Sequence, residues 1–167
     1  MYKRQVYSTN AFSSAQYAID NDFGPVISMG SGGCEQANVA SLDSGRSLAQ
    51  EANLLGVTWV AASGSGGAAD CDWNGSSTAP LATQGLAVDF PASVPEVTAV
   101  GGTDLNEGGG AYWSSSNGAS GGSALSYVPE VSWNDTVYGT GLSSTLAAGG
   151  GGVSIYYPTP ALSLIHI

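Results

Sequence analysis

The stretch Thr58–Asp72, TWVAASGSGGAADCD, decides how this chain can fold. It begins with a short apolar-leaning run, Thr58–Ala62, and changes abruptly to Gly and Ser at Ser63. An apolar run that ends in glycines is typical of a buried parallel strand, and the glycines let the backbone turn sharply and approach a ligand. Ligands of open α/β sheets bind outside the carboxyl ends of the strands, so we expect chemistry in this loop. A glycine-rich surface loop without a function is the alternative.

A strand and a helix are expected directly before this stretch. Pro25–Met29 is a second compact apolar run with a glycine-rich exit. Ser44–Leu55 has the apolar spacing of an amphipathic helix, with Asp43 or Ser44 as its N-cap and Gly56 at the position of a left-handed C-terminal residue. A crossover of this length requires the two strands to be parallel. The predicted fold class is therefore α/β.

Other segments carry weaker signals. A short helix is expected over Ser13–Asp20, with Ser13 or Ser14 as the cap. Between Cys34 and Leu42 the chain either begins the next helix early or forms a separate turn. Short extended segments are expected at Leu86–Phe90, Val97–Val100 and Val153–Tyr157.

The two ends of the chain are unlike the rest of it. Residues 1–5, MYKRQ, hold two of the three basic residues, and residues 162–167, LSLIHI, form an apolar hexapeptide. LSLIHI can be encoded by CTG TCT CTT ATA CAC ATC, and the reverse complement of that DNA contains GTG TAT AAG AGA CAG, which encodes the amino end with a GTG start. This DNA resembles a transposon-end sequencing adapter. We therefore interpret residues 1–5 and 162–167 as adapter-derived scars and residues 6–161 as part of a longer natural domain.

The composition excludes several classes of partner. The chain has 167 residues, 25 of them Gly, and a formal net charge of −10. A surface with this negative charge repels the phosphates of nucleic acids, and it also repels anionic membranes. No apolar run is as long as a membrane-spanning helix requires. Between the two scars, Arg46 is the one basic residue against 13 acidic ones, and there is no His. An acidic, charge-poor, Ser/Gly-rich composition favours a secreted protein.

Two cysteines follow the two predicted strands. Cys34 and Cys71 would lie at the same edge of the sheet, within reach of a disulfide that requires an oxidising compartment. Two free buried thiols are the alternative. A metal site is not expected, because the segment has no His and no CxxC spacing. Asp70 and Asp72 point the same way if their segment is extended; they could bind a cation, but a solvated acidic loop is the simpler interpretation.

Five blocks in order resemble the middle of a sedolisin, one of the serine-carboxyl peptidases, which are acid-active secreted endopeptidases with a subtilisin-like fold. The blocks are PVISMGSGGCE (25–35), GVTWVAASGSGGAADCD (56–72), GLAVDFPASVPEVTAVGGT (85–103), GSALSYVPEVSWNDT (122–136) and GGGGVSIYYPTPA (149–161). The resemblance covers nearly all of residues 6–161. It implies a subtilisin-like, mostly parallel sheet with flanking helices, present here as a partial domain.

The resemblance implies a Ser nucleophile, a Glu base oriented by an Asp, and a second Asp in the oxyanion hole. The Glu and first Asp would lie upstream of this segment, and the nucleophile and calcium ligands downstream of Ala161. Of these catalytic positions, only the oxyanion-hole position lies within this segment. The family pattern there is Ser-Gly-Asp-Ser-Gly, and this chain has Ser63-Gly64-Ser65-Gly66-Gly67 at the corresponding place. Ser65 thus replaces the Asp. The chain as given is expected to be inactive and, without its neighbouring strands, poorly stable.

The same resemblance implies how a substrate would bind. The backbone of Ser28, Met29 and Gly30 would pair with an extended protein or peptide substrate, and Ser63 and Gly64 would line the primary specificity pocket. Plain core packing is the alternative for Met29. The full-length parent would carry calcium and an amino-terminal pro-segment and would be extracellular; no cofactor is expected within this segment.

Two other functions are kept open. A catalytically dead relative that binds peptide is favoured if the catalytic groups are missing from the flanks. A secreted Gly/Ser-rich adhesion or carbohydrate-binding domain would show all-β alternation, against which the helix at Ser44–Leu55 counts.

Overall fold

The computed structural model describes residues 4–73, 82–137 and 145–161. Most of the two predicted adapter-derived ends, residues 1–3 and 162–167, lies outside the described residues. The helices are α1 (Ala11–Asp20) and α2 (Leu42–Leu54), with the 3₁₀ helices η1 (Glu35–Ser41) and η2 (Asp70–Asp72). The strands are β1 (Val26–Met29), β2 (Gly33–Cys34), β3 (Thr58–Ala62), β4 (Asp89–Phe90), β5 (Thr98–Val100), β6 (Thr103–Leu105) and β7 (Glu130–Ser132).

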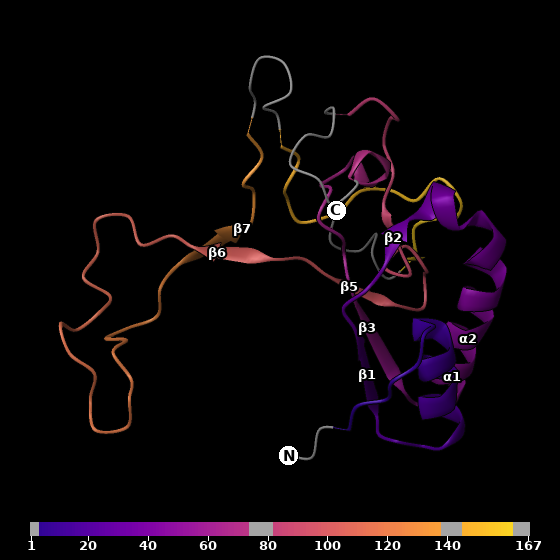
Figure 1. Ribbon diagram of the computed structural model, residues 1–167, viewed down its shortest axis with the longest axis horizontal. Helices are drawn as coiled ribbons and strands as arrows, with labels where there is room; N and C mark the ends of the chain where they lie inside the picture. Colours follow the sequence, from indigo (N-terminus) through magenta and orange to yellow (C-terminus); the bar gives the residue numbers. More distant parts are fainter. Residues whose placement is uncertain (1–3, 74–81, 138–144, 162–167) are drawn as a thin grey trace.

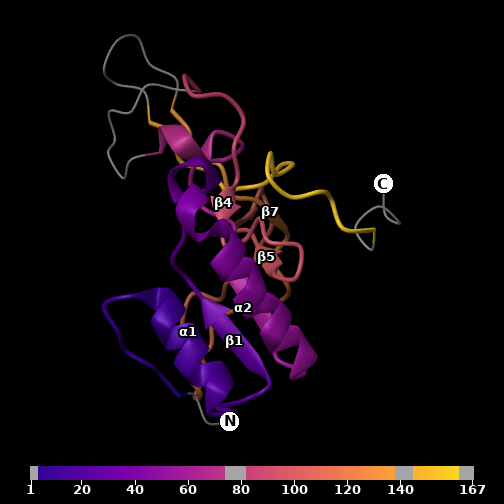
Figure 2. The ribbon, with the colours of Figure 1, turned by 90° about the vertical axis from the view of Figure 1, so that its right-hand side faces the viewer.

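A parallel sheet of three strands, in the order β1-β3-β5, forms the centre of the fold (Figure 1). Val26 is in register with Thr58 and Met29 with Ala61, while Ala62 on the other edge of β3 is in register with Val100. The helices α1 and α2 pack together against one face of β1 and β3, as Figure 2 also shows. The predicted α/β class with a mostly parallel sheet and flanking helices is confirmed, and the all-β alternative is not supported.

The core lies between this sheet and the helices. Trp59 is 1% exposed, and the ring of Phe12 from α1 packs on both Trp59 and Phe90, with centroids 6.2 and 5.2 Å apart. Leu48 and Ala52 of α2 belong to the same cluster. Alternate residues of β3 are buried, which explains why Thr58–Ala62 shows an apolar-leaning run rather than a uniformly apolar one.

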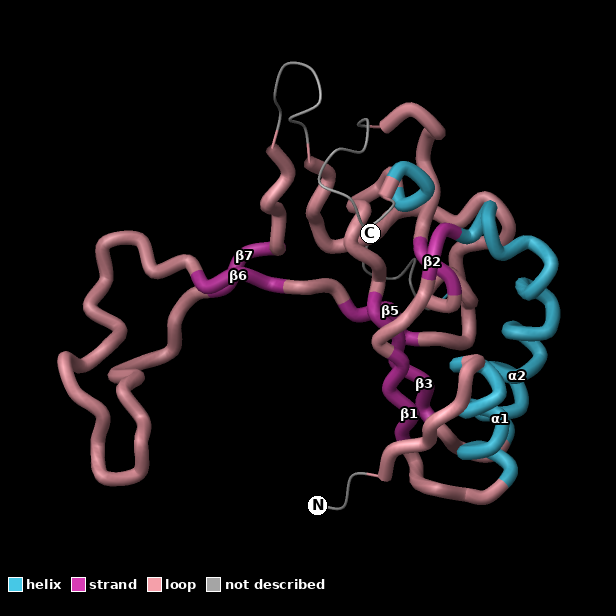
Figure 3. Tube along the Cα trace, viewed as in Figure 1, coloured by secondary structure: helices cyan, strands magenta, loops and turns pink. Residues whose placement is uncertain are grey.

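Two short antiparallel pairs lie outside the central sheet. β2 pairs with β4, and β6 pairs with β7. The segment that joins β6 to β7 makes a long excursion away from the body, drawn in coral and orange in Figure 1 and as loop in Figure 3. Within the described ranges, no helix is long and apolar enough to cross a bilayer.

Three predicted local features differ from the structure. The cap of α1 is Asn10 rather than Ser13 or Ser14, and α2 begins two residues before Ser44, with neither Asp43 nor Ser44 as its cap. The cap of α2, Ser41, makes no side-chain hydrogen bond because η1 runs directly into the helix. The predicted left-handed residue after α2 is confirmed, since Gly56 has φ +75°.

The strand predicted at Val153–Tyr157 is wrong. Its backbone N–H groups bind side chains instead of a neighbouring strand: Ile155 N–H donates to Glu35, and the N–H groups of Tyr156 and Tyr157 donate to Ser154 Oγ. An alternating apolar pattern forms a strand only where a partner strand is available, and here these polar side chains take the partner's place.

Replacing Asn10 by Ala tests the observed cap of α1. The Asn10 side-chain oxygen accepts from the N–H groups of Phe12 and Ser13 at 2.9 and 3.3 Å. Losing this cap is expected to lower the free energy of unfolding by about 1 kcal/mol in urea titrations. Ser13→Ala is the matched control, with a change within about 0.5 kcal/mol. The reverse order of effects would contradict the cap assignment.

Candidate functional site

The loop Ser63–Gly67 leaves β3 at the carboxyl edge of the parallel sheet. Ser63 N–H donates to Val100 O at 3.0 Å, which extends the pairing of β3 with β5 by one residue. The next bonds are made to residues 148–150: Ala148 N–H donates to Ser65 O at 3.0 Å, and Gly150 N–H donates to Gly64 O at 3.1 Å. Backbone hydrogen bonds therefore hold the loop, and most of them come from a segment some 80 residues further along the chain.

Two glycines allow this close approach. A Cβ on Gly150 would overlap the carbonyl oxygen of Ser63, so only glycine lets the two backbones come together. Gly64 has φ +94°, and a Cβ there would lie 2.7 Å from Asp70 Oδ1. Glycines thus allow the loop to pack closely on residue 150 on one side and on Asp70 on the other.

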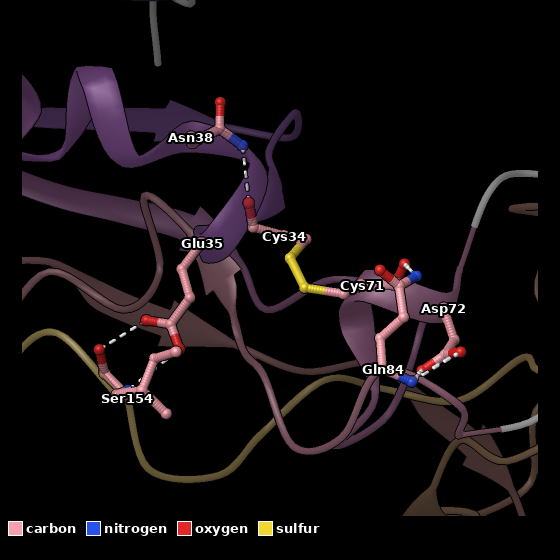
Figure 4. Close-up of a disulfide and its surroundings, with 8 residues drawn as sticks. Cys34, Glu35, Asn38, Cys71, Asp72, Gln84 and Ser154 are labelled. Atoms are coloured by element: carbon pink, nitrogen blue, oxygen red, sulfur yellow. Dashed lines mark hydrogen bonds between the residues drawn. A yellow bond between two sulfur atoms is a disulfide. The ribbon is translucent and has the colours of Figure 1, made fainter.

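A disulfide between Cys34 and Cys71 joins the end of β2 to η2 (Figure 4). The two Cα atoms are 4.8 Å apart, and the bridge spans 37 residues of sequence. In the chain-entropy account, closing a loop of this length stabilises the fold by roughly 3–4 kcal/mol. The bridge holds the residues that follow β1 against those that follow β3, the two segments around the candidate site.

Glu35, directly after Cys34, is fully buried and was not singled out from the sequence. Its carboxylate accepts from Ser154 Oγ at 2.6 Å and from Ile155 N–H at 3.1 Å (Figure 4). Both donors are about 120 residues away, so no local pattern pairs them. The contact fastens residues 154–155 to the corner that also carries the disulfide.

Asp70 and Asp72 do not point the same way, because their segment forms η2 instead of an extended strand. Asp72 accepts from Thr83 and Gln84, and although burial acts in the opposite direction, these hydrogen bonds lower the pKa of its carboxyl. Asp70 turns the other way, toward the loop and Asp89. The expectation of a joint, solvated acidic pair at Asp70 and Asp72 is therefore wrong.

Asp70 instead lies beside Asp89 of β4: both carboxyls pack on Gly64, and each of the two side chains is about 95% buried. Burial raises the pKa of Asp70. Burial, followed by the charge of Asp70 and the hydrogen bond with it, raises the pKa of Asp89 to about 7. Two carboxyl groups buried side by side cannot both ionise cheaply, which favours keeping a proton on one of them in acid.

The residues assigned to substrate binding from the sequence come together at one edge. Met29 is in register with Ala61 of β3, so Gly30 and Ser63 follow neighbouring strand ends. Ser28 and Gly30 are exposed, while the Met29 side chain is part of the core, as its alternative interpretation had it. Ser65 is partly exposed on the loop.

A cavity of about 320 Å³ opens beside the loop. Ser63, Asp89 and Ser93 line it, and each has a buried side-chain oxygen without a hydrogen-bond partner among the described residues. Tyr157 closes another part of its wall, with its hydroxyl donating to Leu42 O at 2.8 Å. In the described ranges no three His, Cys, Asp or Glu side chains gather as a metal ion would need.

These features define an α/β domain with a glycine-rich, backbone-held loop at the carboxyl edge of a parallel sheet. The structure is similar to that of Pseudomonas sedolisin, a serine-carboxyl proteinase, complexed with two molecules of pseudo-iodotyrostatin, at a TM-score of 0.68 and 25% sequence identity. The match covers 95% of this chain and 39% of that one, so the chain spans about two fifths of that protein's length. No protein-family model and no curated protein matches the sequence. The fold is thus sedolisin-like, and the kind of protein it indicates is peptidase-like.

Replacing Gly150 by Ala tests the backbone contact that holds the loop. The added Cβ would overlap the Ser63 carbonyl, and forcing a methyl group into so tight a contact is expected to lower the free energy of unfolding by about 1–3 kcal/mol. Gly151→Ala is the matched control: a Cβ there meets no atom within 4 Å, so its effect should stay within about 0.5 kcal/mol. Equal effects of the two changes in urea titrations would contradict this packing.

Proposed function

We propose that residues 6–161 are an internal part of the catalytic domain of a secreted, acid-active serine-type endopeptidase. Such an enzyme hydrolyses peptide bonds with a Ser nucleophile, a Glu general base and an Asp that orients the Glu. The observation that carries the proposal is the similarity to a serine-carboxyl proteinase over 95% of the chain. The five ordered sequence blocks support it independently, as does the position of Ser63–Gly67 at the edge where ligands of parallel sheets bind.

In this proposal the substrate is a protein or peptide in extended form. It pairs with the exposed backbone edge at Ser28, Met29 and Gly30, where main-chain hydrogen bonds supply affinity. Ser63 and Gly64 line the primary specificity pocket, which agrees with the position of Ser63 on the wall of the cavity. The nucleophile and the base lie outside this segment.

Ser65 takes the position of the oxyanion-hole Asp. A protonated Asp can donate a hydrogen bond to the oxyanion of the tetrahedral intermediate, and donors in such sites are worth on the order of 10²–10³ in rate. The Ser65 hydroxyl also donates, but on a shorter side chain and without titrating near acid pH. The full-length enzyme would therefore be slower and less dependent on pH than one with Asp.

The same substitution favours a second candidate, a catalytically dead relative that binds peptide without cleaving it. The parent sequence on either side of residues 6–161 distinguishes the active enzyme from the peptide-binding relative. A Glu/Asp pair upstream and a Gly-Thr-Ser motif downstream would support the enzyme, and the absence of either would support the binding protein.

The remaining expectations concern the full-length parent. Calcium would be held by residues beyond Ala161, and an amino-terminal pro-segment would accompany the domain. An extracellular location is supported by the acidic composition and by the Cys34–Cys71 disulfide, which persists in oxidising compartments.

The isolated 167-residue chain is expected to cleave no peptide bond. Incubation with a denatured protein at acid pH, followed by mass spectrometry of the products, measures this directly. Full-length protein expressed from the contiguous gene is the positive control. Cleavage by the isolated chain would contradict the proposal that nucleophile and base lie outside it.

Ser65→Asp in the full-length protein tests the role of this position. The longer, protonated side chain is expected to raise kcat at acid pH by about tenfold or more, with the gain lost as the Asp ionises. Ser65→Asn is the matched control, since its amide donates at every pH and should remove the pH dependence of any gain. If Ser65→Asp brings no gain, Ser65 does not occupy the oxyanion position.

A further inference from the structure

Two buried carboxyl groups lie against the turn of the loop Ser63–Gly67. A Cβ on Gly64 would come within 2.7 Å of Asp70 Oδ1 and 3.2 Å of Asp89 Oδ2, so both carboxyls pack on this residue. A Cβ on Gly66 would also come within 3.1 Å of Asp70 Oδ1, and one on Gly32, just before β2, would overlap Asp89 Oδ1. The pair therefore connects the loop to η2 on one side and to β2 and β4 on the other.

The charges around the pair are all negative. Glu35 of η1 raises the pKa of Asp70 further by its charge, while Asp72, on the same 3₁₀ helix, binds Thr83 and Gln84 instead. The described cations are engaged elsewhere: Arg46 forms an ion pair with Glu96, and Arg4 stacks over Phe23. Within the described residues no cation is therefore free to neutralise the two carboxyls.

We propose that Asp70 and Asp89 are positioning residues that hold the Gly64–Gly66 turn through one shared proton, so that the loop keeps its geometry in acid and loosens when that proton leaves. The role rests on the proposed function, in which this turn carries the oxyanion position and a wall of the substrate pocket. Asp89 also lines the cavity beside the loop, but in this role both side chains act through the backbone of the loop. The acid range of the enzyme would then be set partly by this pair rather than by Ser65.

The direction of the pH effect follows from linkage. The folded-state pKa of Asp89, about 7, lies above its ordinary value of 3.8. Between these values the folded chain keeps a proton that the unfolded chain has lost, so stability falls as pH rises and levels off above about 7. The part of the structure that the proton holds directly, the Gly64–Gly66 turn, should open first.

Amide hydrogen exchange of the 167-residue chain, followed by NMR at several values between about pH 5 and pH 8, tests the proposal. The readout is the exchange of Gly66 and Gly67 relative to that of Ala49 and Ala52 in α2. This ratio cancels the direct effect of hydroxide and any global unfolding. It is expected to rise about tenfold or more across the titration.

Asp89→Asn is the decisive variant, because its amide can donate to Asp70 at every pH and should keep the ratio low and constant. Asp72→Asn, a neighbour on the same 3₁₀ helix, and Asp43→Asn, exposed on α2, are the controls and should leave the wild-type profile unchanged. Asp70→Asn provides a second test if Asp89→Asn does not fold: with the like charge gone, the midpoint should move to lower pH.

An unchanged midpoint in both Asp89→Asn and Asp70→Asn would overturn the proposal. So would a wild-type ratio that does not vary with pH, or Gly66 and Gly67 amides that are already unprotected at pH 5. The measurement reads no proteolysis, so its failure leaves the proposed peptidase function standing. Conversely, the finding that the full-length protein has no proteolytic activity would not contradict the proposal of a shared proton.

Discussion

Hydrogen bonding on both edges of β3 is the constraint on which the rest of the structure depends. Because β3 pairs in parallel with β1 and with β5, the residues that follow all three strands meet at one edge of the sheet. The same backbone continues into Ser63–Gly67, which pairs with residues 148–150 after β3 has ended. The disulfide and the Glu35 contacts fasten the surrounding segments to this edge. The loop therefore owes its shape to backbone bonds and glycines rather than to the Ser65 side chain.

The interior of this acidic protein is also unusual in how it treats its carboxyl groups. Glu35, Asp70 and Asp89 are all nearly or fully buried, yet their hydrogen-bond partners are hydroxyl and amide groups or each other, not cations. Burial raises the pKa of both Asp70 and Asp89, so the stability that these two carboxyls contribute is present in acid and declines as pH rises.

The central strand-helix-strand unit could be predicted from sequence because its signals are local. The apolar runs at β1 and β3 and the spacing of α2 lie within single elements, and Gly56 ends α2 as its position indicates. What could not be predicted depends on partners far away in the chain. The sequence suggests Asp72 as the neighbour of Asp70, whereas the fold places Asp89 beside it. Glu35 has partners some 120 residues away, and the strand expected at Val153–Tyr157 was replaced by those same contacts. β6 and β7 were missed because each has three residues and they are separated by a long loop.

The central claim is that Ser63–Gly67 is the oxyanion loop of a peptidase-like domain, and a crystal structure of the full-length protein with a bound peptide aldehyde tests it most directly. Such a compound reacts with a serine nucleophile to give a tetrahedral adduct whose oxygen marks the oxyanion position. We predict that this oxygen lies about 2.7–3.1 Å from the Ser65 hydroxyl, with the peptide paired along Ser28–Gly30. An adduct oxygen directed at another loop, or a peptide bound away from the carboxyl edge of β1 and β3, would contradict the claim.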